Sequence, residues 1–390
     1  MRECRGAGVP VRGEEAMIEF SPEETEFRAS VARFVDAEIV PAAAALDERQ
    51  EFPRELFLRI GRLEYFGLRY PEAAGGSGAG FATYCILAEE LARGSMSVAA
   101  MTAMQAMMGT DFLFRFGTPD QHERLFKPAL RGEKIGAFCL TEPDAGSDLA
   151  RIATTAKETP AGWRLSGSKF WVTSGTVADF FTVAASVDRT KGLKGLKFFL
   201  VERGAPGLVV GRKIKTLGNW GGETTELSLD DAPAAKLGDA GLEDLGKLLN
   251  QIRVMTGALS LGLARAALDE ATRYSKERIC FGQPIANFQA LRHLIAQSWA
   301  DLETSRLAVY QAARMIERNQ KCGAQAAAAK LVASEMANRA ADTALRVLGG
   351  AGFAMEHAAQ RYYRDARFLL IGGGTSEILR NVIAKELLGD

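Results

Sequence analysis

Residues 141–148 read TEPDAGSD and follow the apolar run IGAFCL at residues 135–140. The run predicts a buried strand, because it is short, apolar throughout and bounded by turn residues. Pro143 and Gly146 then force the backbone into a tight, irregular loop. Such a loop exposes N–H groups and hydroxyls, which suit an anion or the edge of a heteroaromatic ring. Taken alone, the stretch is equally typical of an ordinary strand end.

The hydrophobic period changes on either side of this loop. It is helical over residues 21–131, starting from the cap and acidic first turn of Ser21-Pro22-Glu23-Glu24, and it returns to helical from residue 242 onward. Between these two helical regions, apolar residues alternate with a period of two, which predicts strands. We expect a mostly helical α+β fold with an N-terminal helical domain (17–134), a central β domain (135–240) and a C-terminal four-helix bundle (241–390). The predicted strands are 135–140, 154–157, 163–166, 180–186, 196–201 and 225–229, and the predicted C-terminal helices are 245–278, 284–318 and 323–348.

The bulk composition excludes several classes of function. The 390 residues carry 48 basic and 48 acidic side chains, and this balance argues against nucleic acid or an anionic membrane as the main partner. No apolar run is long enough to span a bilayer. The five cysteines are scattered, which predicts reduced thiols in the cytoplasm, and the three separated histidines predict no metal site. Residues 1–16 lack the apolar core of a secretory signal, so we interpret them as a leader or disordered tail, with Met17 as an alternative start.

Four further motifs accompany the first one. They are KFWVTSG at 169–175, RICFGQP at 278–284, LGGAG at 348–352, and YRDAR at 363–367 followed by GTS at 374–376. In this order and spacing, the five motifs resemble the signatures of the FAD-dependent acyl-CoA dehydrogenase family, and they cover nearly the whole chain. The resemblance implies α,β-dehydrogenation of an acyl-CoA thioester, electron transfer to an electron-transferring flavoprotein, and a homotetramer or dimer.

The resemblance also implies where FAD binds. Thr141 and the backbone around Phe138 and Leu140 would meet the edge of the flavin ring, while Trp171 would supply an aromatic face and Thr173 a hydroxyl near the reactive nitrogen. Trp171 is also consistent with simple core packing. Arg278 offers a planar fork suited to a phosphate. The remaining expected FAD contacts are Phe281, Gln289, Arg346 (where the family usually has Gln), Gly349, Gly350, Thr375 and Glu377, and those around the Gly pair would come from a neighbouring subunit.

Three residues are expected at the substrate. Ser147 resembles a residue on the thioester side of the site. Arg253 resembles the family arginine near CoA, although a solvated helix face explains an isolated arginine equally well. Met104 belongs to a methionine stripe in residues 95–108, which is ordinary core filling or, by resemblance, the wall of an apolar acyl pocket.

One departure from the family affects the chemistry directly. Removal of the α-proton of a thioester requires a carboxylate base, which the family places at one of two positions. Those positions are Gly373 and Ile252 in this sequence, and neither is a carboxylate. Gly373 still offers its backbone N–H to a thioester oxygen. The other candidates, Asp111, Glu89, Glu90 and Gln251, are better explained by structural roles.

Three hypotheses therefore remain in competition. The first is an acyl-CoA dehydrogenase with an unusual base or an unusually acidic substrate, and we prefer it because the flavin framework is intact. The second is a redox-neutral elimination, similar to that of family members that release sulfite from a sulfinated acyl-CoA. The third is a catalytically degenerate FAD-binding subunit of a mixed oligomer. A flavin oxidase is a weaker fourth possibility.

Overall fold

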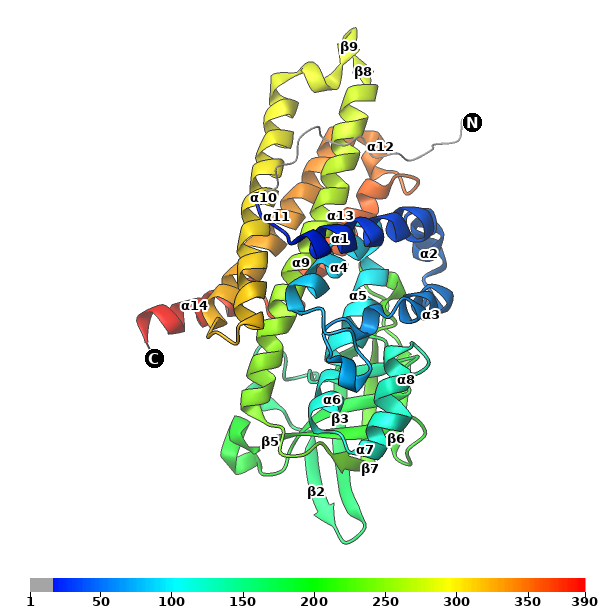
Figure 1. The fold of residues 1–390 in the computed structure, drawn as a ribbon, viewed down its shortest axis with the longest axis vertical. Coiled ribbons are helices and arrows are strands. Elements are labelled where there is room, and N and C mark those ends of the chain that lie inside the picture. Colours follow the sequence, from blue (N-terminus) through cyan, green and yellow to red (C-terminus); the bar gives the residue numbers. More distant parts are fainter. Residues whose placement is uncertain (1–16, 390) are drawn as a thin grey trace.

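The computed structural model describes residues 17–389. The chain passes through a group of N-terminal helices, a central sheet and a set of long C-terminal helices that extend far beyond the sheet (Figure 1). The predicted fold class, mostly helical with a sheet in the middle of the chain, is confirmed. The leader or tail proposed for residues 1–16 lies outside the described residues.

The first helix begins where the sequence indicates. The Ser21 hydroxyl accepts the backbone N–H of Glu24 at 3.2 Å, and the Glu24 carboxylate accepts the N–H of Ser21 at 3.0 Å. These two bonds form a capping box that satisfies free N–H groups of the first turn. The N-terminal helices are α1 (Pro22–Phe34), α2 (Ala43–Arg49), α3 (Arg54–Arg62), α4 (Phe81–Gly94), α5 (Met96–Ala103), α6 (Asp111–Phe116), α7 (Pro119–Gln121) and α8 (Lys127–Leu130).

The central sheet has seven strands, and each predicted strand overlaps one of them. They are β1 (Gly136–Cys139), β2 (Thr155–Thr159), β3 (Gly162–Val172), β4 (Phe180–Ser186), β5 (Leu196–Glu202), β6 (Leu208–Lys213) and β7 (Thr225–Lys236). Strand β4 runs parallel to β1 and antiparallel to β5, and all its residues are buried. The sequence did not predict β6, because none of its residues is fully buried and its hydrophobic alternation is weak.

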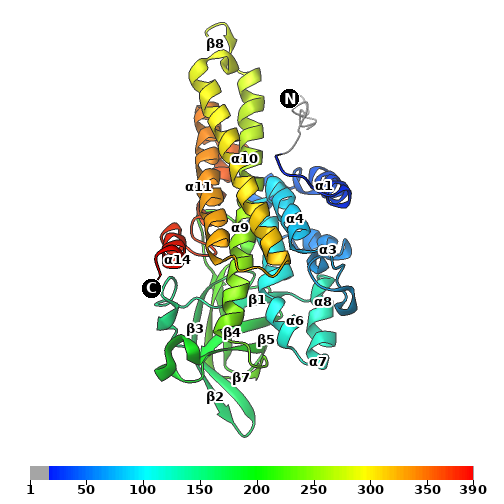
Figure 2. The same cartoon turned by 60° about the vertical axis from the view of Figure 1, so that its left-hand side comes forward.

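The C-terminal region is built on three long helices. They are α9 (Leu242–Glu277), α10 (Gln289–Glu317) and α11 (Gly323–Leu348), followed by α12 (Gly350–Phe353), α13 (Ala358–Leu369) and α14 (Ser376–Leu388). The long helices lie side by side, and α14 projects outward (Figure 2). The predicted start of a helix at Pro284 was wrong, because β8 (Ile279–Cys280) and β9 (Gln283–Pro284) form a hairpin at the tip between α9 and α10.

Helices α4 and α9 approach so closely that their crossing requires a glycine. A Cβ atom built on Gly262 would lie 1.9 Å from the backbone oxygen of Glu89 and 2.9 Å from Cβ of Ala92. No side chain occupies such a space unless the helices separate, and separation would open the core between them. Gly262 therefore fixes how the N-terminal helices sit on the C-terminal ones.

Replacing Gly262 by alanine is expected to destabilise the protein by about 1–3 kcal/mol, the usual effect of overpacking a core. Gly246 provides the matched control, since it lies on the same helix and a Cβ atom there would meet nothing within 4 Å. Gly246→Ala is expected to be neutral or slightly stabilising, because alanine favours helix more than glycine does. Thermal denaturation of both variants tests this, and equal melting temperatures would contradict it.

Candidate active site

The first two sequence motifs meet through a buried ion pair. The Lys169 ammonium lies 2.7 Å from the Glu142 carboxylate and also donates to the carbonyl of Leu140 at 3.2 Å. The other bonds of Glu142 come from the N–H groups of Ala153 and Thr154, at 2.7 and 3.1 Å. Burial opposes ionisation of Glu142, but Lys169 and these N–H groups outweigh it, so the pKa of Glu142 lies below its usual value. The pair fixes the loop that follows β1.

The segment after Lys169 presents an aromatic ring beside this loop. The N–H of Phe170 donates to the carbonyl of Thr141 at 2.8 Å, which places Trp171 next to the end of β1. Trp171 has φ of 59° and a half-exposed side chain, with 54% of its surface accessible. An exposed tryptophan in a rarely populated backbone conformation is not explained by core packing. Thr173 follows two residues later and is half-buried. The flavin contacts of Thr141, Trp171 and Thr173 stay predictions.

The two positions that lack the base lie against each other. A Cβ atom built on Gly373, which has φ of 75°, would lie 3.4 Å from Cγ2 of Ile252 and 3.1 Å from the Thr256 hydroxyl. Ile252 is buried, and Thr256 Oγ1 donates to the carbonyl of Ile252 at 2.8 Å. Helix α9 and the loop before α14 thus form one small site. Of the two positions at which a glutamate was expected there, Ile252 is apolar and Gly373 has no side chain.

The other residues considered as a base form hydrogen bonds or ion pairs with arginines. Asp111 lies 2.8 Å from both Arg69 and Arg115. Gln251 accepts a bond from Arg69 at 2.6 Å. Glu89 and Glu90 each bind several cations, at N–O distances between 2.6 and 3.2 Å, in a buried network that comprises Arg28, Arg93, Arg265 and Arg306. These partners give each candidate a structural role.

The predicted FAD residues lie in two separate regions of the folded protein. Arg278, Phe281 and Gln289 lie at the tip formed by the β8–β9 hairpin, while Thr141 and Trp171 lie at the sheet (Figures 1 and 2). Along α9, Arg278 is roughly 39 Å beyond Ile252, at about 1.5 Å per residue. The Phe281 ring is 94% exposed, and Cβ atoms on Gly349 and Gly350 would meet nothing within 4 Å. The exposed ring and the open backbone fit FAD, but one copy of the chain does not gather them around one flavin.

The other predicted contacts lie around the C-terminal turn and on α11. The Thr375 hydroxyl caps α14 by accepting the N–H of Ile378 at 3.4 Å. Glu377 and Arg346 are exposed, and Arg346 lies in the last turn of α11. Their FAD contacts stay predictions.

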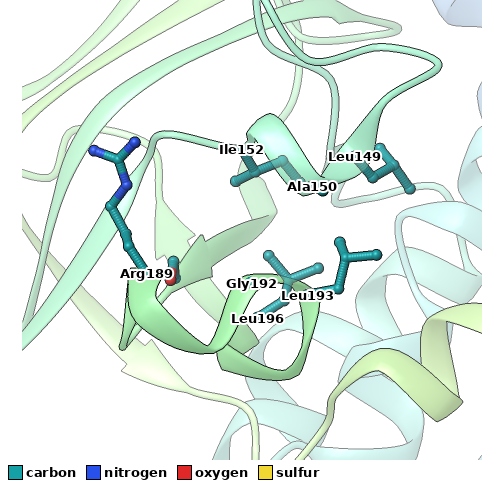
Figure 3. Close-up of a pocket in the computed structure, with 8 residues that line it drawn as sticks. Leu149, Ala150, Ile152, Arg189, Gly192, Leu193 and Leu196 are labelled. Carbon is teal, nitrogen blue, oxygen red and sulfur yellow. The ribbon is translucent and has the colours of Figure 1, made fainter.

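The predicted substrate residues lie on three separate elements. Ser147 is exposed, and a small pocket begins two residues after it, between Leu149–Ile152 and residues 189–196, with the Arg189 guanidinium apart from the apolar side chains (Figure 3). Met104 is buried at the start of a π-helical turn (Met104–Met108), and this turn and α5 contact α9. Arg253 is half-buried, so it does not belong to a solvated helix face.

Comparison with known families decides the membership of the chain. Residues 21–133, 137–232 and 239–388 match the profiles of the acyl-CoA dehydrogenase N-terminal, middle and C-terminal domains, respectively. The chain belongs to the acyl-CoA dehydrogenase family. The predicted family, its FAD-dependent enzyme class and its cofactor are thereby confirmed.

Individual relatives cover almost the full length of this acyl-CoA dehydrogenase homologue. Benzylmalonyl-CoA dehydrogenase of Aromatoleum aromaticum is 48% identical over 95% of this chain and 99% of its own. A glutaryl-CoA dehydrogenase solved in complex with glutaryl-CoA is 33% identical, with a TM-score of 0.92, over 95% of this chain and 96% of its own. The Mycobacterium smegmatis glutaryl-CoA dehydrogenase in complex with FADH2 is 29% identical, with a TM-score of 0.90, over the same shares.

Several residues of the site were not predicted from the sequence. Lys169 and Glu142 carried a detectable signal, since a charged residue in or directly after an apolar strand requires a partner. Lys330 carried a similar signal, because a charged side chain that lies among buried alanines on α11 also requires a partner. Within residues 17–389, no helix is long and apolar enough to cross a membrane, and no cluster of potential ligands could hold a metal ion.

Proposed function

We propose that this protein oxidises a 2-carboxyacyl-CoA, a substituted malonyl-CoA with an apolar substituent, and releases CO2. The contact between Gly373 and Ile252 carries the proposal, because it leaves no carboxylate where the family places its base. A carboxyl group at C2 removes the need for that base: when its C–C bond to C2 breaks, the bonding electron pair stays on C2 and CO2 departs. The name of the 48% identical relative, benzylmalonyl-CoA dehydrogenase, describes a substrate of this class.

The residues of this chain bind and orient the thioester. The backbone N–H of Gly373 is available to the thioester oxygen, where negative charge develops as CO2 leaves. Ile252 excludes water from the reacting carbon, and the methionine stripe around Met104 receives the apolar substituent. FAD, held by Thr141, Trp171 and Thr173, would supply the acceptor for the hydride of the β-carbon. The overall reaction would convert 2-carboxyacyl-CoA, oxidised FAD and one proton into enoyl-CoA, CO2 and reduced FAD.

The divided FAD residues support an oligomer. We propose that Arg278, Phe281, Gln289 and the Gly349-Gly350 turn contact the FAD of a second copy, in a homotetramer or dimer. Their exposure, and the place of Arg278 at the far end of α9 from Ile252, are the supporting observations. By resemblance we also retain electron-transferring flavoprotein as the electron acceptor, a cytoplasmic location, and domains at 17–134, 135–240 and 241–390.

Anaerobic mixing of the FAD-loaded protein with paired thioesters tests the function. We expect benzylmalonyl-CoA or ethylmalonyl-CoA to bleach the flavin band and release one CO2 per flavin, whereas phenylpropionyl-CoA and butyryl-CoA leave the flavin oxidised. Bleaching by the thioesters without a carboxyl group would establish an unidentified base and refute the proposal. Product without bleaching would favour the redox-neutral elimination, and no reaction with any thioester would favour a degenerate subunit.

A further inference from the structure

A buried lysine lies beside the missing base. Lys330, on α11, is fully buried, and its ammonium donates to the carbonyl of Gly374 at 2.6 Å. Gly374 directly follows Gly373, so the cation is at the edge of the small site formed with Ile252. An ammonium has three N–H donors. Among residues 17–389, the bond to Gly374 is the one hydrogen bond that the Lys330 ammonium forms.

A second cation lies next to Ile252 on α9, and its charge acts on Lys330. Arg253 follows Ile252, and its guanidinium donates one bond, to the side-chain oxygen of Asn250 at 3.0 Å. Its Nε atom is buried and has no hydrogen-bond partner in the described part of the chain. Neither Arg253 nor Lys330 forms an ion pair with a described residue, although burial of a cation without an anion is costly.

The surrounding charges do not compensate this pair. Burial and the nearby charge of Arg253 lower the pKa of Lys330 to about 8, against weaker attraction from Glu335 and Glu377. Both of those acids lie closer to Arg380, at 2.6 and 3.9 Å. Burial also lowers the pKa of Arg253, with no acid acting on it. Among residues 17–389, no acid pairs with either cation, so the site holds positive charge that these residues do not balance.

We propose that Lys330 and Arg253 bind the C2 carboxylate of the substrate and thereby select 2-carboxyacyl-CoA over acyl-CoA. This inference rests on the proposed function and assigns its specificity to two residues. The cations remain compensated while CO2 leaves, because CO2 departs as a neutral molecule and the negative charge moves to the thioester oxygen of the same substrate. The charge leaves the substrate only with the hydride. They bind the carboxylate and do not touch the hydride that is transferred.

Binding measurements on the FAD-loaded protein test the inference without flavin reduction. Malonyl-CoA and acetyl-CoA differ by the carboxyl group, and neither carries a β-hydrogen that could leave as hydride. We expect the wild type to bind malonyl-CoA more tightly than acetyl-CoA. Arg253→Gln should lower the affinity for malonyl-CoA by about 10- to 100-fold, the effect of losing a hydrogen bond to a charged group. Acetyl-CoA should bind Arg253→Gln within about twofold of wild type, and Arg253→Lys should restore part of the preference.

The outcomes separate the inference from the proposed function. Arg339→Gln is the matched control, because this arginine pairs with Asp301 on the exposed side of α11, and it should change neither affinity. Equal weakening of malonyl-CoA and acetyl-CoA by Arg253→Gln would indicate a contact with CoA and overturn the inference, as would equal wild-type affinities. Lys330→Met should also lose the preference. A wild type that binds malonyl-CoA more tightly than acetyl-CoA but releases no CO2 from benzylmalonyl-CoA would refute the proposed function, while still supporting carboxylate binding by Lys330 and Arg253.

Discussion

Replacing Ile252 by glutamate is expected to let the protein oxidise saturated acyl-CoA thioesters that carry no carboxyl group. The Ile252 side chain is buried and points at Gly373, at 3.4 Å from its Cβ position, so a carboxylate built there would face the carbon next to the thioester. A correctly placed general base contributes about 10²- to 10⁴-fold to the rate of proton removal. We therefore expect butyryl-CoA or phenylpropionyl-CoA to bleach the flavin at least about 100-fold faster than in the wild type.

The variant should lose its reaction with 2-carboxyacyl-CoA at the same time, because two carboxylates in a small site repel each other. Ile252→Gln is the control, since glutamine has nearly the same size and shape but cannot take a proton, and it should give no gain. A gain by Ile252→Gln equal to that of glutamate would show that cavity shape, not a base, limits the wild type. Gly373→Glu is the poorer choice, because φ of 75° and the Thr256 hydroxyl at 3.1 Å oppose a side chain there.

Local sequence patterns predicted much of the fold. The bounds of α11 were predicted from the periodic apolar residues of 323–348, and the helix cap at Ser21 from its residue types. The patterns failed where tertiary contacts decide the structure. Strand β6 is half-exposed on both faces, and the β8–β9 hairpin turns at Phe281 through positive φ values in a stretch that reads as a helix start.

The site could be predicted in composition but not in arrangement. The motifs predicted FAD residues, yet no sequence pattern states that Arg278 lies at the tip of the long helices while Trp171 lies at the central sheet. The sequence shows that Gly373 and Ile252 are not carboxylates, but their contact depends on how the loop before α14 packs on α9. The uncompensated charge of Lys330 and Arg253 was hidden as well, because a sequence does not show which acids reach a buried cation.

Replacing Glu89 by glutamine is expected to cause the largest loss of stability among the substitutions considered. The Glu89 carboxylate is 1% exposed and accepts bonds from Arg306 at 2.9 Å, Arg28 at 3.2 Å and the Tyr310 hydroxyl at 2.8 Å. It thus joins α1, α4 and α10 at one point. Removing its charge deprives Arg306, which is buried, and Arg28, which is half-buried, of their shared anion. Loss of one partner of a buried ion pair typically costs about 3–5 kcal/mol.

The pH dependence of stability follows from the same network. Burial alone would raise the pKa of Glu89, but the arginines and Tyr310 outweigh it and lower the pKa to about 2 from a model-peptide value of 4.5. The stabilisation is therefore complete above about pH 4.5 and is lost as the pH falls toward 2, by about 3 kcal/mol in total. Guanidinium denaturation should show Glu89→Gln far less stable than wild type at pH 7, with the gap narrowing as the pH falls below 4.5. Glu243→Gln, which removes an exposed ion pair with Lys247, should behave as wild type. A gap that stays constant down to the lowest pH at which both proteins fold would show that Glu89 stabilises by shape and not by charge.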